Sequence, residues 1–301
     1  MSDEQPLLRE LMKRAVHAAR LAGERVMSHY GKDLEILSKG IGTHTGDCVT
    51  QADHDAQDLI FKSLFHDMEN DPLLRDCALL SEEMDNHQDS RRFEKKYTFL
   101  IDPLDGTRGF IDHNNSFGVS IGLIRRDHTP VFGVVLLPAT GKLFTGFHQS
   151  EAHLNGQVLS PADPDDGELV LYVSEAEIFP AANNRIWHQL CDGIKARTAI
   201  TKIRPCVIGS PVHKGCLTAE CSKPALYLGL PREVKGVSLW DMAAIAAIVS
   251  GAGGHVSDVF GEPLEFNRHG STYIHHKGFL YCNSPGIAKA ALAAYAELGQ
   301  T

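Results

Sequence analysis

The sequence predicts a mixed α/β protein in which helices are layered with two sheets. Short apolar segments rich in β-favouring residues cluster between residues 78 and 147. From residue 169 onward, strand and helix patterns alternate along the chain. The stretch from Ser160 to Gly167, rich in proline, aspartate and glycine, separates these two groups. We therefore expect an N-terminal α+β subdomain over residues 1–160 and a C-terminal α/β subdomain over residues 161–301.

The first half is expected to contain two helices and five strands. Apolar residues at three- and four-residue spacing predict a helix over Leu7–Tyr30. Three glycines and two threonines in Lys39–Asp47 break that pattern and predict a mobile loop. A second helix is expected to begin near Asp53 and to continue through Phe65. The five predicted strands are Ala78–Leu80, Tyr97–Ile101, Gly118–Ile124, Val131–Leu137 and Lys142–Phe147.

The second half is expected to alternate between strands and helices, and it contains no internal repeat. The predicted strands are Leu169–Val173, Ile203–Ile208, Ala225–Leu230, Gly254–Val259 and Phe279–Cys282. The predicted helices are Asn184–Cys191, Lys214–Ala219, Trp240–Ser250 and Gly286–Leu298.

Composition and charge exclude several classes of protein. With 301 residues the chain can bury one large core or two closely packed subdomains. Its net charge of −9 argues against binding to a nucleic-acid polymer or an anionic membrane. No apolar run reaches the ~18 residues that a membrane span needs, and the N-terminus lacks the pattern of a signal peptide. Seven cysteines without a C-x-x-C pair fit free thiols, so we expect a cytoplasmic protein.

The segment Leu100–Thr107 carries the most chemical information. Asp102 and Asp105 supply two carboxylates, Leu104 supplies a carbonyl between them, and a threonine hydroxyl follows. Such a set of hard oxygen ligands suits Mg²⁺. The backbone N–H groups of the Gly106–Arg108 turn are able to meet an anion if a helix starts there. Because Asp, Pro and Gly are also ordinary turn formers, a simple turn that closes a strand is the alternative interpretation.

Acidic residues elsewhere in the chain favour the metal site over the simple turn. Glu82 and Glu83 end a short apolar run, Asp241 opens an Ala-rich helical run, and Asp53 stands at a helix start. Acids at strand ends and helix starts can converge at one edge of a layered α/β fold. Asp53 and Asp241 have a second interpretation as helix N-caps, and Glu83 as a surface or supporting acid. Trp240 is expected to pack in the core, the sixteen histidines are too scattered to indicate a metal site, and the pair His275-His276 is expected to be solvated.

Four motifs in this order resemble the lithium-sensitive, Mg²⁺-dependent inositol monophosphatase superfamily. They are Val49–Asp53, Ser81–Glu83, Asp102–Thr107 and Trp240–Ala244, and the resemblance extends from the N-terminal helix to Asn283. It implies an α/β/α/β/α sandwich of the inositol monophosphatase and fructose-bisphosphatase type. It also implies a phosphate monoesterase with a small-molecule substrate and a homodimeric assembly.

The resemblance also implies residue roles. A first Mg²⁺ would be held by Glu82, Asp102 and the Leu104 carbonyl, and a second by Asp102, Asp105 and Asp241, with two or three ions in all. Thr107, with Asp53 behind it, would orient the attacking water. The amides of Gly106 and Thr107 would hold phosphate oxygens, and Arg108, Lys214 and Asp241 would contact the rest of the substrate. Most metal ligands would thus lie in the first subdomain.

Within the superfamily, two features resemble the 3′(2′),5′-bisphosphate nucleotidase branch. The sequence Arg108-Gly109-Phe110 follows the metal motif, and Ser81 precedes the glutamates. Lys214 matches a Ser-x-x-Lys segment that meets a second phosphate, with one extra residue after Ser210. Against this branch, the segment Ser222–Gly229 has lost the aspartate and the arginine that the family usually carries there. The basic residues that would substitute for them, unless they form a solvated loop, are Lys223, Arg232 and Lys235.

The sequence therefore ranks four functions. Hydrolysis of the 3′-phosphate of adenosine 3′,5′-bisphosphate comes first and inositol monophosphate hydrolysis second. Histidinol-phosphate or sugar-bisphosphate hydrolysis comes third. A catalytically silent phosphate-ligand sensor is the alternative from another class. The carboxylates retained at all five expected positions argue against the sensor, since it would not need a metal clamp.

Overall fold

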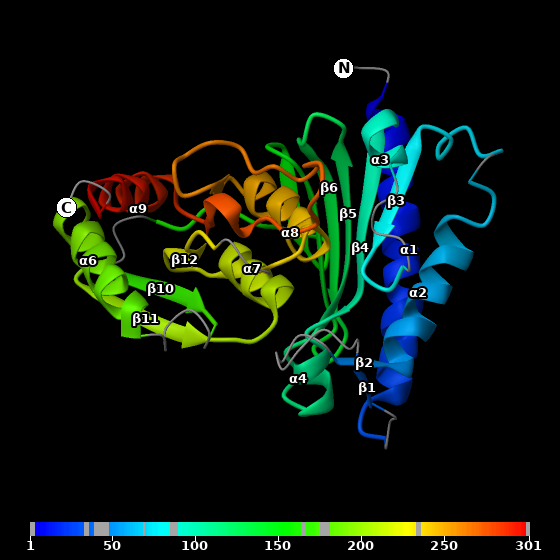
Figure 1. The fold of residues 1–301 in the computed structure, drawn as a ribbon, viewed down its shortest axis with the longest axis horizontal. Coiled ribbons are helices and arrows are strands. Elements are labelled where there is room, and N and C mark those ends of the chain that lie inside the picture. The colour runs from blue at the N-terminus through cyan, green and yellow to red at the C-terminus, as the bar shows by residue number, and fades with distance from the viewer. Residues whose placement is uncertain are drawn as a thin grey trace.

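The computed structural model describes residues 4–32, 36–38, 48–68, 70–84, 90–163, 167–174, 181–232 and 236–298. The predicted loop Lys39–Asp47 and Lys235 lie outside the described residues. Five layers follow one another across the molecule in Figure 1: two helices, a sheet, two helices, a second sheet and two helices. The predicted α/β/α/β/α sandwich is confirmed. The division into subdomains near residue 160 remains a prediction.

The first layer consists of α1 (Gln5–His29) and α2 (Gln51–Leu64). The apolar stripe that predicted α1 is buried, with Leu11, Ala15, Ala18, Ala22 and Val26 fully enclosed. These residues form one core with α2 and one face of the first sheet. Burying such a stripe contributes about 25 cal/mol per Å² of apolar surface removed from water, which is why the helix lies flat on the sheet.

The first sheet has seven strands in the order β3-β4-β5-β6-β7-β8-β9. Strands β3 and β4 are parallel and the other neighbours are antiparallel. Beyond the predicted strands, the described residues contain β8, β9, the pair β1-β2 and two short helices, α3 and α4. The bounds are β1 Ile36–Ser38, β2 Cys48–Thr50, β3 Cys77–Ser81, α3 Arg91–Glu94, β4 Tyr97–Asp105, α4 Thr107–Ile111, β5 Gly118–Arg125, β6 Pro130–Leu137, β7 Lys142–Phe147, β8 Glu151–Leu154 and β9 Gln157–Val158.

The second sheet has five strands in the order β11-β10-β12-β14-β13. Strands β10, β11 and β12 are parallel, and β14 runs antiparallel to both β12 and β13. Helices α7 and α8 fill the space between the two sheets, and α6 and α9 cover the outer face (Figure 1). The bounds are β10 Glu168–Val173, α6 Ala181–Arg197, β11 Lys202–Val207, α7 Pro211–Glu220, β12 Ala225–Gly229, α8 Leu239–Gly251, β13 His255–Ser257, η1 His275–Lys277, β14 Phe279–Cys282 and α9 Pro285–Leu298.

A ladder of three glycines lets α8 lie directly on the first sheet. Gly122, Gly133 and Gly146 face one another across β5, β6 and β7. A Cβ at Gly122 or Gly146 would come within 2.8 Å of the backbone of α8, and one at Gly133 would collide with Ala244. All thirteen residues of α8 are buried. The close approach matters for function because it carries Asp241, in the first turn of α8, toward the end of β4.

Two local predictions are wrong. Strand β4 does not stop before Asp102 but continues through Pro103 to Asp105, because an irregularity in its pairing with β5 accommodates the proline. His275 is not solvated: its side chain is 2% exposed, and its Nδ1 accepts a hydrogen bond from the Val237 N–H at 2.5 Å. Burial lowers the pKa of His275 to about 3, so the ring is neutral.

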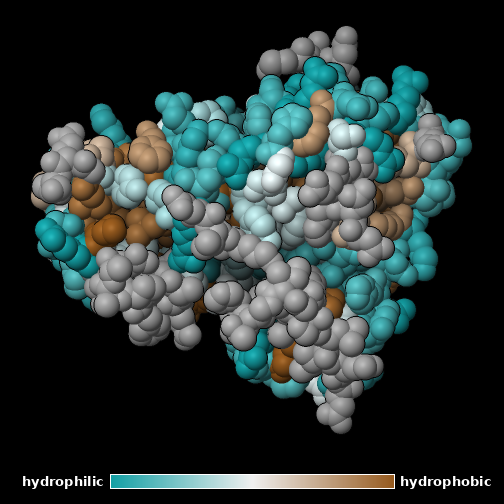
Figure 2. Space-filling model, in the orientation of Figure 1, coloured by the Kyte–Doolittle hydropathy of each residue, from teal (hydrophilic) through white to brown (hydrophobic). Residues whose placement is uncertain are grey.

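The surface is mainly polar, in agreement with the charge and the lack of long apolar runs in the sequence. Figure 2 shows a mainly hydrophilic face, with hydrophobic residues showing through near α6 and α9. No helix in the described ranges is long and apolar enough to cross a membrane. The six cysteines whose side chains are described are free thiols, and the side chain of Cys48 lies outside that set.

Candidate metal centre and active site

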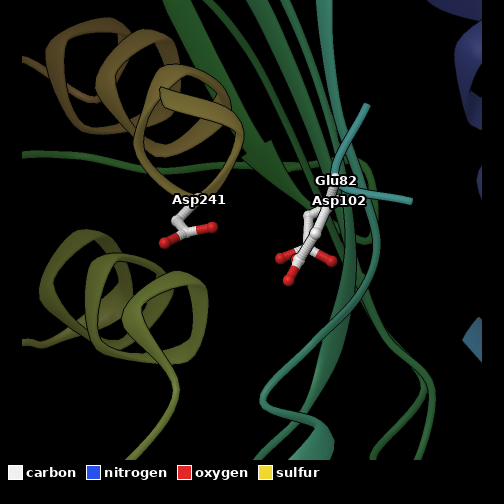
Figure 3. A group of neighbouring side chains, drawn as sticks. All are labelled: Glu82, Asp102 and Asp241. Atoms are coloured by element: carbon white, nitrogen blue, oxygen red, sulfur yellow. The ribbon is translucent and has the colours of Figure 1, made fainter. Parts of the chain in front are cut away.

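Three carboxylates from distant parts of the chain converge between the first sheet and α8. Glu82, Asp102 and Asp241 each offer an oxygen within 4.8 Å of the others (Figure 3). Because β3 and β4 are parallel, the residues at their carboxyl ends meet at one edge of the sheet. The Glu82 N–H donates to the Ile101 carbonyl at 3.1 Å, which holds the start of the turn against β4. The predicted convergence of these three acids is thus present in the structure.

A bulge in β4 decides how the two aspartates of the central motif are presented. Asp102 pairs with Ser120 and Asp105 with Gly118, so β4 carries one extra residue between these pairs. In a regular strand, two residues three apart would point to opposite faces. The extra residue offsets that alternation, and the two carboxyl groups are close enough for Asp105 to raise the pKa of Asp102.

Asp105 is oriented by the N-terminus of α7. One of its carboxylate oxygens accepts hydrogen bonds from the Ser210 hydroxyl and from the Val212 N–H, the latter at 3.0 Å. It is not one of the three carboxylates that converge within 4.8 Å. The carbonyl of Leu104, the other predicted ligand, lies 3.1 Å from Thr107 Oγ1. The chain between β4 and α4 therefore presents a carboxylate and a carbonyl beside the cluster.

Thr107 and Asp53 form the pair that the sequence predicted. The Thr107 hydroxyl lies 3.1 Å from Asp53 Oδ1, and the other oxygen of Asp53 accepts from the Thr50 N–H and hydroxyl at 2.8 and 2.7 Å. Asp53 is the N3 residue of a capping box whose N-cap is Thr50, and Asp241 holds the same position behind Ser238. Neither aspartate is itself the N-cap. Each uses one oxygen to fix its helix and keeps the other for the site.

Gly106 allows the turn between β4 and α4. Its φ of 81° lies in the left-handed region, and a side chain there would collide with the Ser116 carbonyl. The glycine thereby lets the chain reverse immediately after Asp105 and begin α4 at Thr107.

The site is strongly acidic and buried, and burial sets its electrostatics. Burial first, and then neighbouring carboxylates, raise the pKa of Asp102 and of Asp241 well above the ordinary range. Burial likewise raises the pKa of Asp105 and of Asp53 to about 7. Carboxylates crowded in this way repel one another unless a cation lies between them. Because all the donors are oxygen atoms, the residues fit a hard divalent cation such as Mg²⁺ rather than a soft one.

We expect the metal-free protein to lose stability as the pH rises through neutrality. Asp105 and Asp53 stay protonated in the folded protein above the ordinary carboxyl pKa, near 4, so the stability that they contribute is lost as pH rises through about 7. Burial lowers the pKa of His213 to about 4 and that of His275 to about 3. These two histidines make stability rise with pH, but only below about pH 6.5, the ordinary pKa of histidine. In EDTA, Tm should therefore fall between about pH 6.5 and pH 8, and Mg²⁺ should restore it. The measurement is thermal unfolding followed by circular dichroism.

The Asp102→Asn variant is the control for this effect, because it removes one titrating group from the cluster. Its Tm should change less with pH in EDTA than that of the unaltered protein. A metal-free protein whose Tm is the same at both pH values would contradict the electrostatic picture.

The basic residues predicted to contact substrate form hydrogen bonds or ion pairs with other groups of the protein. Arg108 is exposed on α4, where its Nε donates to Asp112 at 2.7 Å. Lys214 is only 2% exposed, and its ammonium donates to backbone carbonyls. Nothing in these contacts supports the expected contact of Lys214 with a second phosphate, which stays a prediction. Lys223 donates to Glu168 at 2.5 Å, in a group of ion pairs at the start of β10.

Three supporting residues were not foreseen from the sequence. Ser210 donates to Asp105, and His213 Nδ1 lies 3.2 Å from Ser116 Oγ across the turn at Gly106. Gln57 accepts from the Ser81 hydroxyl at 2.6 Å and donates to the Glu83 carbonyl at 3.1 Å, so it holds the turn that carries Glu82. Ser210 appeared in the sequence analysis only as part of the Ser-x-x-Lys segment, and its place before Pro211, which is typical of an N-cap, was the signal for its structural role.

Comparison with known protein families identifies the family to which this chain belongs. Residues 7–300 match the model of the inositol monophosphatase family. This chain belongs to the inositol monophosphatase family. The buried carboxylates, the bulged β4 strand and the layered fold described above are thus features of a family phosphatase, and the family assignment made from the motifs is confirmed.

Relatives with two different activities resemble this inositol monophosphatase family member to similar degrees. Human inositol monophosphatase 2 is 28% identical over 265 residues, covering 85% of this chain and 83% of that protein. The 3′(2′),5′-bisphosphate nucleotidase CysQ of Escherichia coli K12 is 31% identical over 259 residues, covering 85% and 94%. The suppressor protein suhB of Bartonella henselae shares the fold with a TM-score of 0.68 and 24% identity, covering 95% of this chain and 98% of that one.

Proposed function

We propose that this protein is a Mg²⁺-dependent phosphate monoesterase that removes the 3′-phosphate of adenosine 3′,5′-bisphosphate. The observation that carries the proposal is the convergence of Glu82, Asp102 and Asp241. Beside them, the Thr107 hydroxyl lies 3.1 Å from the buried carboxylate of Asp53. This combination supplies a cation clamp and a water-orienting pair in one place, as hydrolysis of a phosphate ester requires.

The residues would form two binding positions for Mg²⁺. Glu82, Asp102 and the Leu104 carbonyl would hold one Mg²⁺, and Asp102, Asp105 and Asp241 a second. When bound, Mg²⁺ neutralises the phosphoryl charge and lowers the pKa of a bound water. The shared Asp102 explains why the cluster is built around the bulge of β4.

The protein's own groups would position the reacting water and take up its proton. The Thr107 oxygen lies 3.1 Å from both Asp53 Oδ1 and the Leu104 carbonyl; with its one hydroxyl hydrogen directed at Asp53, it would keep its lone pairs for a water. As the water oxygen bonds to phosphorus and the P–O ester bond breaks, one water proton would pass through the Thr107 hydroxyl to Asp53, and the leaving ester oxygen would take a proton from solvent water to become the alcohol. Burial raises the pKa of that carboxyl to about 7, which suits a proton acceptor near neutral pH. The backbone N–H groups of Gly106 and Thr107 would hold the phosphate oxygens.

Inositol monophosphate is the second candidate substrate, and a specific observation favours it. The ammonium of Lys214, which the nucleotidase reading assigned to a second phosphate, is buried among carbonyls. The segment Ser222–Gly229 also lacks the aspartate and the arginine that the resemblance leads one to expect there. Support for the nucleotide therefore comes from the sequence Arg108–Phe110, from Ser81 and from the similarity to CysQ.

A phosphate-release panel tests the proposal directly. We expect the purified protein with Mg²⁺ to hydrolyse adenosine 3′,5′-bisphosphate with a higher kcat/KM than inositol 1-phosphate, histidinol phosphate or fructose 1,6-bisphosphate. A higher kcat/KM for inositol 1-phosphate would reassign the substrate. Binding of these compounds without any phosphate release would instead support the silent sensor. The homodimer and the cytoplasmic location stay predictions.

A further inference from the structure

Lys214 is a buried cation in the first turns of α7. Its side chain is 2% exposed, and its Nζ donates to the Ile208 carbonyl at 3.0 Å and lies 3.4 Å from the Gly209 carbonyl. The ammonium also lies 5.0 Å from the ring centroid of Tyr227, within the range of a cation–π interaction. A lysine is rarely this buried unless its charge is compensated, so its surroundings require an explanation.

The carbonyls that Lys214 binds lead directly into the residue that orients Asp105. Ile208 and Gly209 immediately precede Ser210, the N-cap of α7. The Ser210 hydroxyl accepts from the His213 N–H at 2.9 Å and donates to Asp105. A short chain of hydrogen bonds therefore runs from the Lys214 ammonium through the backbone and the Ser210 hydroxyl to the carboxylate of Asp105.

We propose that Lys214 is a positioning residue: it holds the segment before Ser210 and so orients Asp105 toward the second metal ion. The inference rests on the proposed function, because it takes Asp105 as a metal ligand. It differs from a substrate contact in an essential respect. A positioning lysine affects metal binding without any substrate, whereas a lysine that meets a second phosphate affects only substrates that carry one.

The test is a Mn²⁺ titration of the metal-free protein, followed by electron paramagnetic resonance and calorimetry. Lys214→Met keeps most of the side-chain volume and removes the charge and the donors. We expect it to weaken one Mn²⁺ site by about 10- to 100-fold, the range for loss of hydrogen bonds to a charged group. The matched control is Lys142→Met, which removes the lysine that pairs with Glu220 at the other end of α7 and should leave both sites unchanged.

A double-mutant cycle locates the effect. If Lys214 acts through Asp105, then Lys214→Met should weaken Mn²⁺ binding in the unaltered protein but add little in an Asp105→Asn background. Equal weakening in both backgrounds would overturn the proposal. So would unchanged Mn²⁺ binding in a folded Lys214→Met protein.

Two further measurements distinguish a positioning role of Lys214 from a substrate contact and from a folding defect. Lys214→Met should lower kcat equally for adenosine 3′,5′-bisphosphate and inositol 1-phosphate, whereas a rise in KM confined to the bisphosphate would overturn the proposal. If Lys214→Met does not fold, Lys214→Gln keeps a polar side chain but places its N–H one bond short of the lysine ammonium, so it should hold the Ile208 carbonyl less well and weaken the same Mn²⁺ site; no change would again overturn the proposal. Because Mn²⁺ binding needs no substrate, failure of the proposed function would appear separately, as absent phosphate release from a protein that still binds Mn²⁺.

Discussion

Replacing Asp102 with asparagine is expected to lower kcat by about 10²- to 10⁴-fold while leaving the fold intact. Asp102 is the acid shared by both proposed metal positions, and a metal ion supplies several kcal/mol of charge stabilisation in the transition state. The amide is nearly the same size as the carboxylate but carries no charge, so metal affinity should fall with turnover. The measurement is phosphate release at several Mg²⁺ concentrations, with circular dichroism to confirm folding.

Asp102→Asn should at the same time stabilise the metal-free protein at alkaline pH, where the crowded carboxyls are ionised, since it removes one of the charges that repel one another. The matched control is Asp58→Asn on the exposed side of α2, where the carboxylate is 70% exposed and lies 3.7 Å from Lys62. This control should change neither kcat nor Tm appreciably. Full activity of the unaltered protein in excess chelator would rule out the metal mechanism altogether.

Replacing Thr107 with valine is expected to lower kcat by about 10²- to 10⁴-fold, the usual contribution of a positioned proton-transfer group. Valine has the shape of threonine but cannot receive a proton from water or pass one to Asp53. Because this interaction would be made mainly in the transition state, kcat and kcat/KM should fall together. Mn²⁺ binding, measured without substrate, should change far less than kcat.

Thr107→Ser is the matched control because it retains the hydroxyl, and we expect it to recover most of the activity. Asp53→Asn should lower kcat as well, but it also weakens the capping box of α2 and should reduce Tm. A Thr107→Val enzyme with normal kcat would remove Thr107 from the catalytic groups. An equal loss of kcat and of Mn²⁺ affinity would place Thr107 with the metal ligands instead.

Local patterns predicted much of the fold because they report burial. The apolar spacing of α1 and the β-favouring runs of the first sheet reflect which faces must leave water, and the structure has them close to the predicted bounds. One predicted strand is much shorter in the structure, which shows where local patterns fail. The predicted strand Gly254–Val259 is reduced to β13 (His255–Ser257), because the Asp258–Glu262 segment forms a turn held by the Asp258 carboxylate.

The sequence by itself singled out the residues that are proposed to carry the chemistry. Glu82, Asp102, Asp105, Asp241 and Asp53 are acids placed at strand ends and helix starts, where they can converge in a layered α/β fold, and Thr107 follows the central motif. The resemblance of these motifs to one family then ordered them into roles. None of this required knowledge of which segments pack against one another.

Only the tertiary structure decided how those residues are presented and what supports them. The bulge that accommodates Pro103, the glycine ladder beneath α8 and the bond from Ser210 to Asp105 depend on segments far apart in the chain. Lys214 shows the reason most clearly. A lysine in a helix start is ordinarily solvated, but here the packing of α7 against α8 and β12 encloses it. Burial is a property of what surrounds a side chain, and a sequence read locally does not contain those surroundings.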